Sequence, residues 1–141
     1  MLTIPRRLLE RAISHALRTY PNECCGILAG RQDGDKRWVV STRAVHNQAA
    51  GSARDRYTIN PLHYIRVEKS LQASGQVVVG FYHSHPEHPP YPSAFDLEAA
   101  WPTESLSYLI IGVRKEGPAE WKSWVWSPDG PRLEEEQVEV T

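Results

Sequence analysis

Two histidines, His83 and His85, stand at the end of an apolar run, 77–81, that has the composition of a buried strand. If this run is a strand, both imidazoles leave the same face of the sheet. Ser93 and Asp96 follow in a helix-like stretch, three residues apart and therefore on one helical face. Two imidazoles and one carboxylate match a catalytic zinc site, which has three protein ligands and one open position.

Each part of this pattern also has a simpler explanation. Ser93 and Asp96 have the spacing of a capping box, in which each side chain bonds a free backbone amide. Histidines at strand ends are commonly partly buried hydrogen-bonding residues. The combination favours a site, because a glutamate, Glu23, also begins an apolar run far upstream of the histidines.

Hydrophobic periodicity and turn residues predict the elements that must position these side chains. We expect helices over 3–20, 60–74 and 93–101. We expect strands over 23–30, 37–45, 56–59, 77–83, 106–113, 121–126 and 133–140, and a mobile loop over 46–56. Helices alternating with strands in this order predict an α/β fold, with one mixed sheet flanked by helices. At 141 residues we expect one domain, 1–141.

Composition excludes several classes of protein. The formal net charge is -1 and no basic cluster is interleaved with aromatic residues, so we expect no nucleic-acid partner. No apolar run approaches the roughly 20 residues of a membrane span, and the first residues lack the apolar segment of a secretory signal. The only cysteines, Cys24 and Cys25, are sequence neighbours and are poorly placed to bridge each other. We therefore expect no membrane association and a cytoplasmic, reducing location.

The complete pattern resembles the signature of the JAMM (MPN-plus) metallopeptidases over nearly the whole chain. Its positions are a glutamate, a His-Ser-His-Pro run, and a serine and an aspartate separated by two residues: Glu23, His83, Ser84, His85, Pro86, Ser93 and Asp96. The resemblance implies a cytidine deaminase-like α-β-α sandwich. It also implies that His83, His85 and Asp96 bind one Zn²⁺ per chain, although the same ligand set accepts iron or cobalt. Glu23 would act as general base, and Ser93 would donate a hydrogen bond to the oxyanion.

The resemblance also implies a substrate class. The compact chain looks like the bacterial stand-alone peptidases, of which the CysO-cysteine peptidases are the best-known group. The implied partner is a ubiquitin-like sulfur-carrier protein with a Gly-Gly C-terminus, from which the enzyme would release an amino acid, cysteine above all, or a peptide. The carrier tail could add to a sheet edge as a strand, and the loop 46–56 is the candidate clamp. The sequence leaves the oligomeric state open.

Other functions are weighed against this one. A zinc deaminase would need a Pro-Cys-X-X-Cys element, and one class of metalloprotease would need His-Glu-X-X-His; the sequence has neither. Cys24 or Cys25 could be a nucleophile, but two small buried core residues are the simpler interpretation. Glu87 and His88 could be extra ligands, yet their proline-rich loop predicts that they face solvent. A non-catalytic MPN scaffold and a phage-tail-like cell-wall hydrolase stay open as alternatives.

Overall fold

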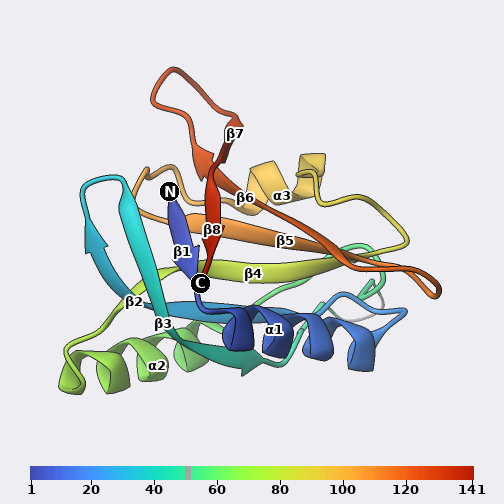
Figure 1. The fold of residues 1–141 in the computed structure, drawn as a ribbon, viewed down its shortest axis with the longest axis horizontal. Coiled ribbons are helices and arrows are strands. Elements are labelled where there is room, and N and C mark those ends of the chain that lie inside the picture. Colours follow the sequence, from blue (N-terminus) through green and yellow to red (C-terminus); the bar gives the residue numbers. More distant parts are fainter. Residues whose placement is uncertain (50–51) are drawn as a thin grey trace.

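The computed structural model describes residues 1–49 and 52–141 (Figure 1). Its helices are α1 (Arg6–Thr19), α2 (Pro61–Ala73) and α3 (Ala94–Ala99). Its strands are β1 (Leu2–Ile4), β2 (Cys25–Asp33), β3 (Lys36–Val45), β4 (Val77–Pro86), β5 (Ser107–Val113), β6 (Glu120–Trp126), β7 (Leu133–Glu136) and β8 (Val138–Val140). Within the described residues, no helix is long and apolar enough to cross a membrane.

The strands form one mixed sheet in the order β7-β6-β5-β4-β2-β3-β1-β8. The central pair β4 and β5 is parallel, whereas β2 is antiparallel to both of its neighbours. Two hydrophobic clusters cover the two faces: the α1 residues Leu8, Leu9 and Ala12 belong to one, and the α2 residues Val67 and Leu71 belong to the other. The predicted class, an α/β fold with a mixed sheet flanked by helices, is confirmed.

The sheet curls so strongly that its two edges meet. Strands β7 and β8 lie at opposite edges, yet only Gln137 separates them along the chain. Glu136, at the end of β7, forms an ion pair with Arg37 of β3 at 3.4 Å. The prediction of one strand over 133–140 was wrong, because the chain leaves one edge of the curled sheet at Gln137 and joins the other.

Two further differences concern short segments. Residues 2–4 form strand β1, which pairs with β3 and β8, although the sequence favoured the start of a helix there. The strand predicted over 56–59 is absent, and this described segment makes only isolated hydrogen bonds, such as Gln48 N to Thr58 O at 2.9 Å. Both segments are too short for periodicity to decide, since tertiary pairing determines whether they join a sheet.

The site-bearing strand β4 runs through the middle of the sheet, with α1 and α2 below it and α3 above it in Figure 1. Every residue from Val79 to Pro86 is buried. Gly80 allows β4 to lie close to β5, because a Cβ there would come within 2.0 Å of the Ser107 carbonyl oxygen. The fold therefore holds the end of β4 rigidly between β2 and β5.

Candidate metal centre

Strand β4 directs two imidazoles to one face of the sheet. His83 and His85 are 1% and 6% exposed, and their Nε2 atoms lie 3.2 Å apart. Ser84, between them, points to the other face, where its Oγ accepts a hydrogen bond from the Cys24 amide at 2.8 Å. The alternation of a strand thus produces the same-face pair that the sequence predicted.

The carboxylate of Asp96 completes a triangle with the two imidazoles. Its Oδ1 lies 3.1 Å from His83 Nε2, and its Oδ2 lies 3.0 Å from His85 Nε2. Asp96 belongs to α3, and the capping box holds it: Ser93 N donates to Asp96 Oδ2 at 2.9 Å, and Asp96 N donates to Ser93 Oγ at 3.1 Å. The capping interpretation is therefore confirmed, and the same carboxylate also faces both histidines.

The spacing of these atoms suits a tetrahedral metal ion. Zinc binds imidazole nitrogens and carboxylate oxygens at about 2.0–2.2 Å, so two ligand atoms of a tetrahedral site lie about 3.3 Å apart. The three distances between the groups are 3.0, 3.1 and 3.2 Å, and the two that involve Asp96 end on different oxygens of its carboxylate. Three buried groups whose lone pairs converge in this way fit a cation, and His83, His85 and Asp96 are the residues that could hold it.

Glu23 lies two residues before the start of β2 and brings a second carboxylate to the site. It is 5% exposed, and its side chain belongs with His83 and His85 to a group whose ligand atoms all lie within 4.8 Å of one another. Its Oε1 is buried and has no hydrogen-bond partner among the described residues. An exposed glutamate is the usual finding at a strand start, so this buried and unpartnered carboxyl makes Glu23 a candidate functional residue.

The two carboxyl groups, Glu23 and Asp96, have pKa values shifted in opposite directions. Burial raises the pKa of Glu23 to about 8. Burial also acts to raise the pKa of Asp96, but hydrogen bonds with His83 and His85 outweigh it and hold that pKa well below its usual range. Burial lowers the pKa of His83; in His85 the hydrogen bond to Asp96 overcomes burial and raises the pKa. One carboxyl is therefore poised to gain and lose a proton near neutral pH, while the other stays ionised.

The imidazole of His85 is also held at Nδ1, the ring nitrogen that does not face Asp96. His85 Nδ1 lies 3.2 Å from the Pro89 carbonyl oxygen, and Trp124 Nε1 donates to the Pro90 carbonyl at 3.0 Å. A Cβ on Gly112 would lie 2.7 Å from the His88 carbonyl oxygen, so the proline-rich loop packs closely on β5. A carbonyl on the far nitrogen fixes the tautomer of a ligating histidine, which leaves Nε2 free to bind a metal.

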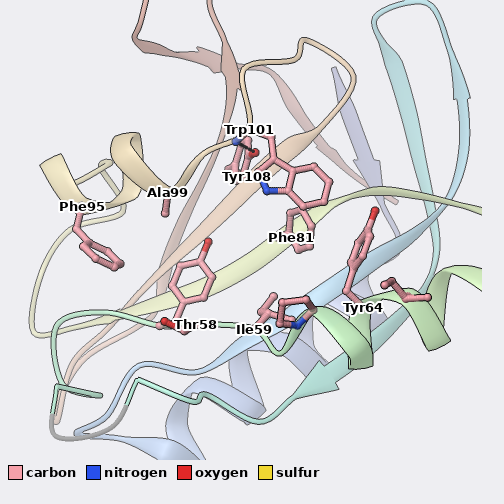
Figure 2. Close-up of a pocket in the computed structure, with 11 residues that line it drawn as sticks. Thr58, Ile59, Tyr64, Phe81, Phe95, Ala99, Trp101 and Tyr108 are labelled. Atoms are coloured by element: carbon pink, nitrogen blue, oxygen red, sulfur yellow. Dashed lines mark hydrogen bonds between the residues drawn. The ribbon is translucent and has the colours of Figure 1, made fainter.

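Aromatic side chains line a pocket between β4, β5, α2 and α3 (Figure 2). It has a volume of about 420 Å³. Most of its walls are apolar, and the largest side chains are Tyr57, Tyr64, Phe81, Phe95, Trp101 and Tyr108. Phe81 lies two residues before His83 on β4, and Phe95 precedes Asp96 on α3. The pocket therefore adjoins the triangle and could hold an apolar part of a substrate.

Comparison with known proteins identifies the family. The model of the prokaryotic homologues of the JAB domain, Prok-JAB, matches residues 5–127. The chain belongs to the Prok-JAB family. The predicted JAMM/MPN resemblance is thereby confirmed at the level of the family.

Curated relatives of this Prok-JAB domain carry the names of peptidases. It is 42% identical to a desampylase of Haloferax volcanii over 73% of this chain and 71% of that protein. It is 35% identical to a probable TtuB-protein conjugate cleaving protease of Thermus thermophilus, over 80% of this chain and 71% of that protein. It is 27% identical to the CysO-cysteine peptidase of Mycobacterium bovis, over 88% of this chain and 82% of that protein.

Solved structures share the fold of the Prok-JAB domain. A protein of Desulfitobacterium hafniense aligns with a TM-score of 0.85 and 35% identity, covering 100% of this chain and 93% of that one. A JAB1/MPN domain protein of Archaeoglobus fulgidus aligns with a TM-score of 0.62 and 21% identity, covering 99% of this chain and 98% of that one. The second likeness shows the fold alone.

The structure brings all five predicted site residues of the Prok-JAB domain together, whereas Glu87 and His88 are exposed, as the sequence predicted. Part of the predicted mobile loop 46–56 lies outside the described residues. Two residues near the site, Asn47 and Tyr57, were missed. Asn47 has no motif around it, and the only signal for Tyr57 is an aromatic residue within a polar stretch.

Proposed function

We propose that the chain is a zinc-dependent peptidase that hydrolyses the amide bond after the C-terminal Gly-Gly of a ubiquitin-like sulfur-carrier protein. The released group is an amino acid, cysteine above all, or a peptide. The observation that carries this proposal is the triangle of His83, His85 and Asp96, with sides of 3.0–3.2 Å and the buried carboxyl of Glu23 beside it. The names of the peptidase relatives support the same class of reaction.

The chain's own residues account for the proton transfers. His83, His85 and Asp96 would hold the zinc ion, which when bound would supply a water of lowered pKa, a polarised substrate carbonyl and a charge that favours the ionised form of Glu23. Glu23 takes the proton of the attacking water at its carboxylate and returns it to the departing amine. The Ser93 hydroxyl, which accepts the capping bond at 3.1 Å and donates none to the described part of the chain, is free to donate to the oxyanion.

The aromatic pocket supports a substrate that arrives as an extended, apolar tail. Phe81, Phe95, Trp101 and Tyr108 line it, and none of the described residues in its wall is charged. A tail ending in Gly-Gly is narrow enough to reach a buried metal centre, while an apolar side chain upstream of the glycines fills the pocket. The loop 46–56 is the clamp in this proposal, and a sheet edge receives the tail by strand addition.

We place the whole reaction in one domain, 1–141, in the cytoplasm. Two buried cysteines without a disulfide, Cys24 and Cys25, agree with a reducing compartment. A non-catalytic MPN scaffold is the weaker alternative, because a scaffold has no need of four convergent buried ligand-type side chains. A cell-wall hydrolase would act on a peptidoglycan peptide in place of a carrier.

Intact mass measurement of carrier conjugates tests the proposal. A Gly-Gly carrier bearing a C-terminal cysteine or peptide should lose that extension, and a chelator should stop the loss. Glu23→Gln should keep the metal but lower the rate by about 10³-fold, within the range of a general acid–base residue. A carrier that stays intact with zinc-loaded protein contradicts the proposal, and cleavage of peptidoglycan peptides in its place favours the cell-wall alternative.

A further inference from the structure

The two predicted imidazole ligands differ in what holds their far nitrogens. His85 Nδ1 faces the Pro89 carbonyl at 3.2 Å. His83 Nδ1 is buried and has no hydrogen-bond partner among the residues that the structure describes. A ligating histidine almost always donates from its second nitrogen to a carbonyl, a carboxylate or a water. The described residues offer His83 no such acceptor, so any orientation of its ring by the protein comes from a different kind of contact.

The side chain that lies against His83 is Tyr57. The two rings stack with their centroids 4.5 Å apart and an angle of 26° between their planes. Stacking over the whole ring fixes the plane of an imidazole more firmly than a single apolar contact does. The same tyrosine also lines the aromatic pocket, so it separates the proposed ligand from the proposed substrate site.

Asn47 fixes the backbone on both sides of Tyr57. Its Nδ2 donates to the Arg56 carbonyl at 3.0 Å, and its Oδ1 accepts from the Thr58 amide at 3.1 Å. The same Nδ2 donates to the Glu23 carbonyl at 3.0 Å. One amide side chain thus connects the segment that carries Tyr57 to the residue that carries the proposed base.

We infer that Tyr57, anchored by Asn47, is the positioning residue of His83 and takes the place of the missing hydrogen bond at its Nδ1. This inference rests on the proposed metal site. Loss of the ring would free the imidazole to rotate about its side-chain bonds, and an unoriented ligand binds a metal more weakly. Loss of the hydroxyl alone would change little, because the stacking uses the ring.

Zinc affinity, measured by competition with a chromogenic chelator, tests the inference. Tyr57→Leu should lower the affinity about tenfold, the low end of the effect of residues that orient a metal ligand. Tyr57→Phe is the matched control and should bind zinc as the wild type does. The thermal midpoint of the metal-free proteins is measured alongside, so that a change in affinity is separated from a loss of folding.

The outcomes are distinct. Wild-type zinc affinity in folded Tyr57→Leu overturns the inference alone, whereas a wild-type protein that binds no zinc overturns the proposed function and the inference with it. If Tyr57→Leu does not fold, Asn47→Asp replaces it, since this change keeps the acceptor oxygen and loses the bonds to Glu23 and Arg56. Asn47→Asp should then lower the affinity, and an unchanged affinity would contradict the anchoring role.

Discussion

Two buried polar clusters of the described residues differ in how far their polar atoms find hydrogen-bond partners. At the curled edge of the sheet, Arg37 is 2% exposed and donates to Glu136 and to the backbone carbonyls of Glu104 and Ser105. Glu136 also receives the Ser123 hydroxyl at 2.7 Å and the Met1 ammonium at 3.0 Å. Every nitrogen of the guanidinium and both oxygens of the carboxylate therefore have partners.

The candidate metal centre leaves some of its buried polar atoms without partners. Glu23 Oε1 and His83 Nδ1 are buried without partners among the described residues, and the nearest ligand atoms of His83, His85 and Asp96 lie 3.0–3.2 Å apart. An unsatisfied buried polar group costs about 1–3 kcal/mol. A fold retains this cost where the atoms are needed for binding or chemistry. A satisfied cluster such as Arg37 and Glu136 has a structural role instead, because it holds the two edges of the sheet together.

The largest expected effect belongs to the satisfied cluster. Arg37→Met should lower the free energy of unfolding by about 3 kcal/mol, because Glu136 would remain buried with fewer partners. The loss lies at the low end of the range for broken buried pairs, since Glu136 keeps Ser123 and Met1. Chemical denaturation measures it. Zinc content and kcat per folded molecule should not change.

The double variant Arg37→Met/Glu136→Leu is the control for this prediction. Removal of both charges should restore part of the lost stability, because an apolar pair leaves no fully buried charge unpaired. The Met1 ammonium would lose Glu136, but it is partly exposed and keeps its hydrogen bond to the Asp35 carbonyl. If kcat per folded molecule fell strongly in Arg37→Met, the two clusters would be coupled, and the prediction that Arg37 affects stability alone would be wrong.

Substitution of Ser93 tests the candidate metal centre. Ser93→Ala should lower kcat about 10²-fold if its hydroxyl donates to the oxyanion, while the loss of the cap should reduce stability by only about 1 kcal/mol. Steady-state kinetics and denaturation curves separate the two effects. Ser93→Thr keeps both the capping oxygen and the hydroxyl and should retain most of the activity. A loss of stability with unchanged kcat would leave Ser93 as a helix cap alone.

The smallest effect, counted per pH unit, concerns the unpartnered Glu23. Its pKa in the folded metal-free protein is raised to about 8 by burial, above the ordinary value of 4.5. Between these values the folded state holds a proton that the unfolded state has lost. The free energy of unfolding should therefore fall as pH rises from 5 to 8, by at most about 1.4 kcal/mol per pH unit. Below pH 4.5 this contribution is fully present.

Glu23→Gln isolates this slope from the other titrating groups. The difference in unfolding free energy between wild type and Glu23→Gln, both metal-free, should change with pH in this window and level off above pH 8. A flat difference across the window would mean that Glu23 is already ionised in the folded protein.

The sequence by itself determined the local features of this protein. Alternation along an apolar run put His83 and His85 on one face, since a strand has a period of two whatever its neighbours are. Serine and aspartate three residues apart gave the capping box of α3. The family signature depends on such short spacings, so it was readable without coordinates.

Tertiary structure decided what joins segments that lie far apart in the chain. The split of 133–140 into β7 and β8 follows from the curl of the whole sheet. The burial of Glu23, the stacking of Tyr57 on His83 and the four bonds of Asn47 depend on loops that carry no periodic pattern. Backbone hydrogen bonds and packing place these loops, and a linear sequence does not encode such contacts at any fixed spacing.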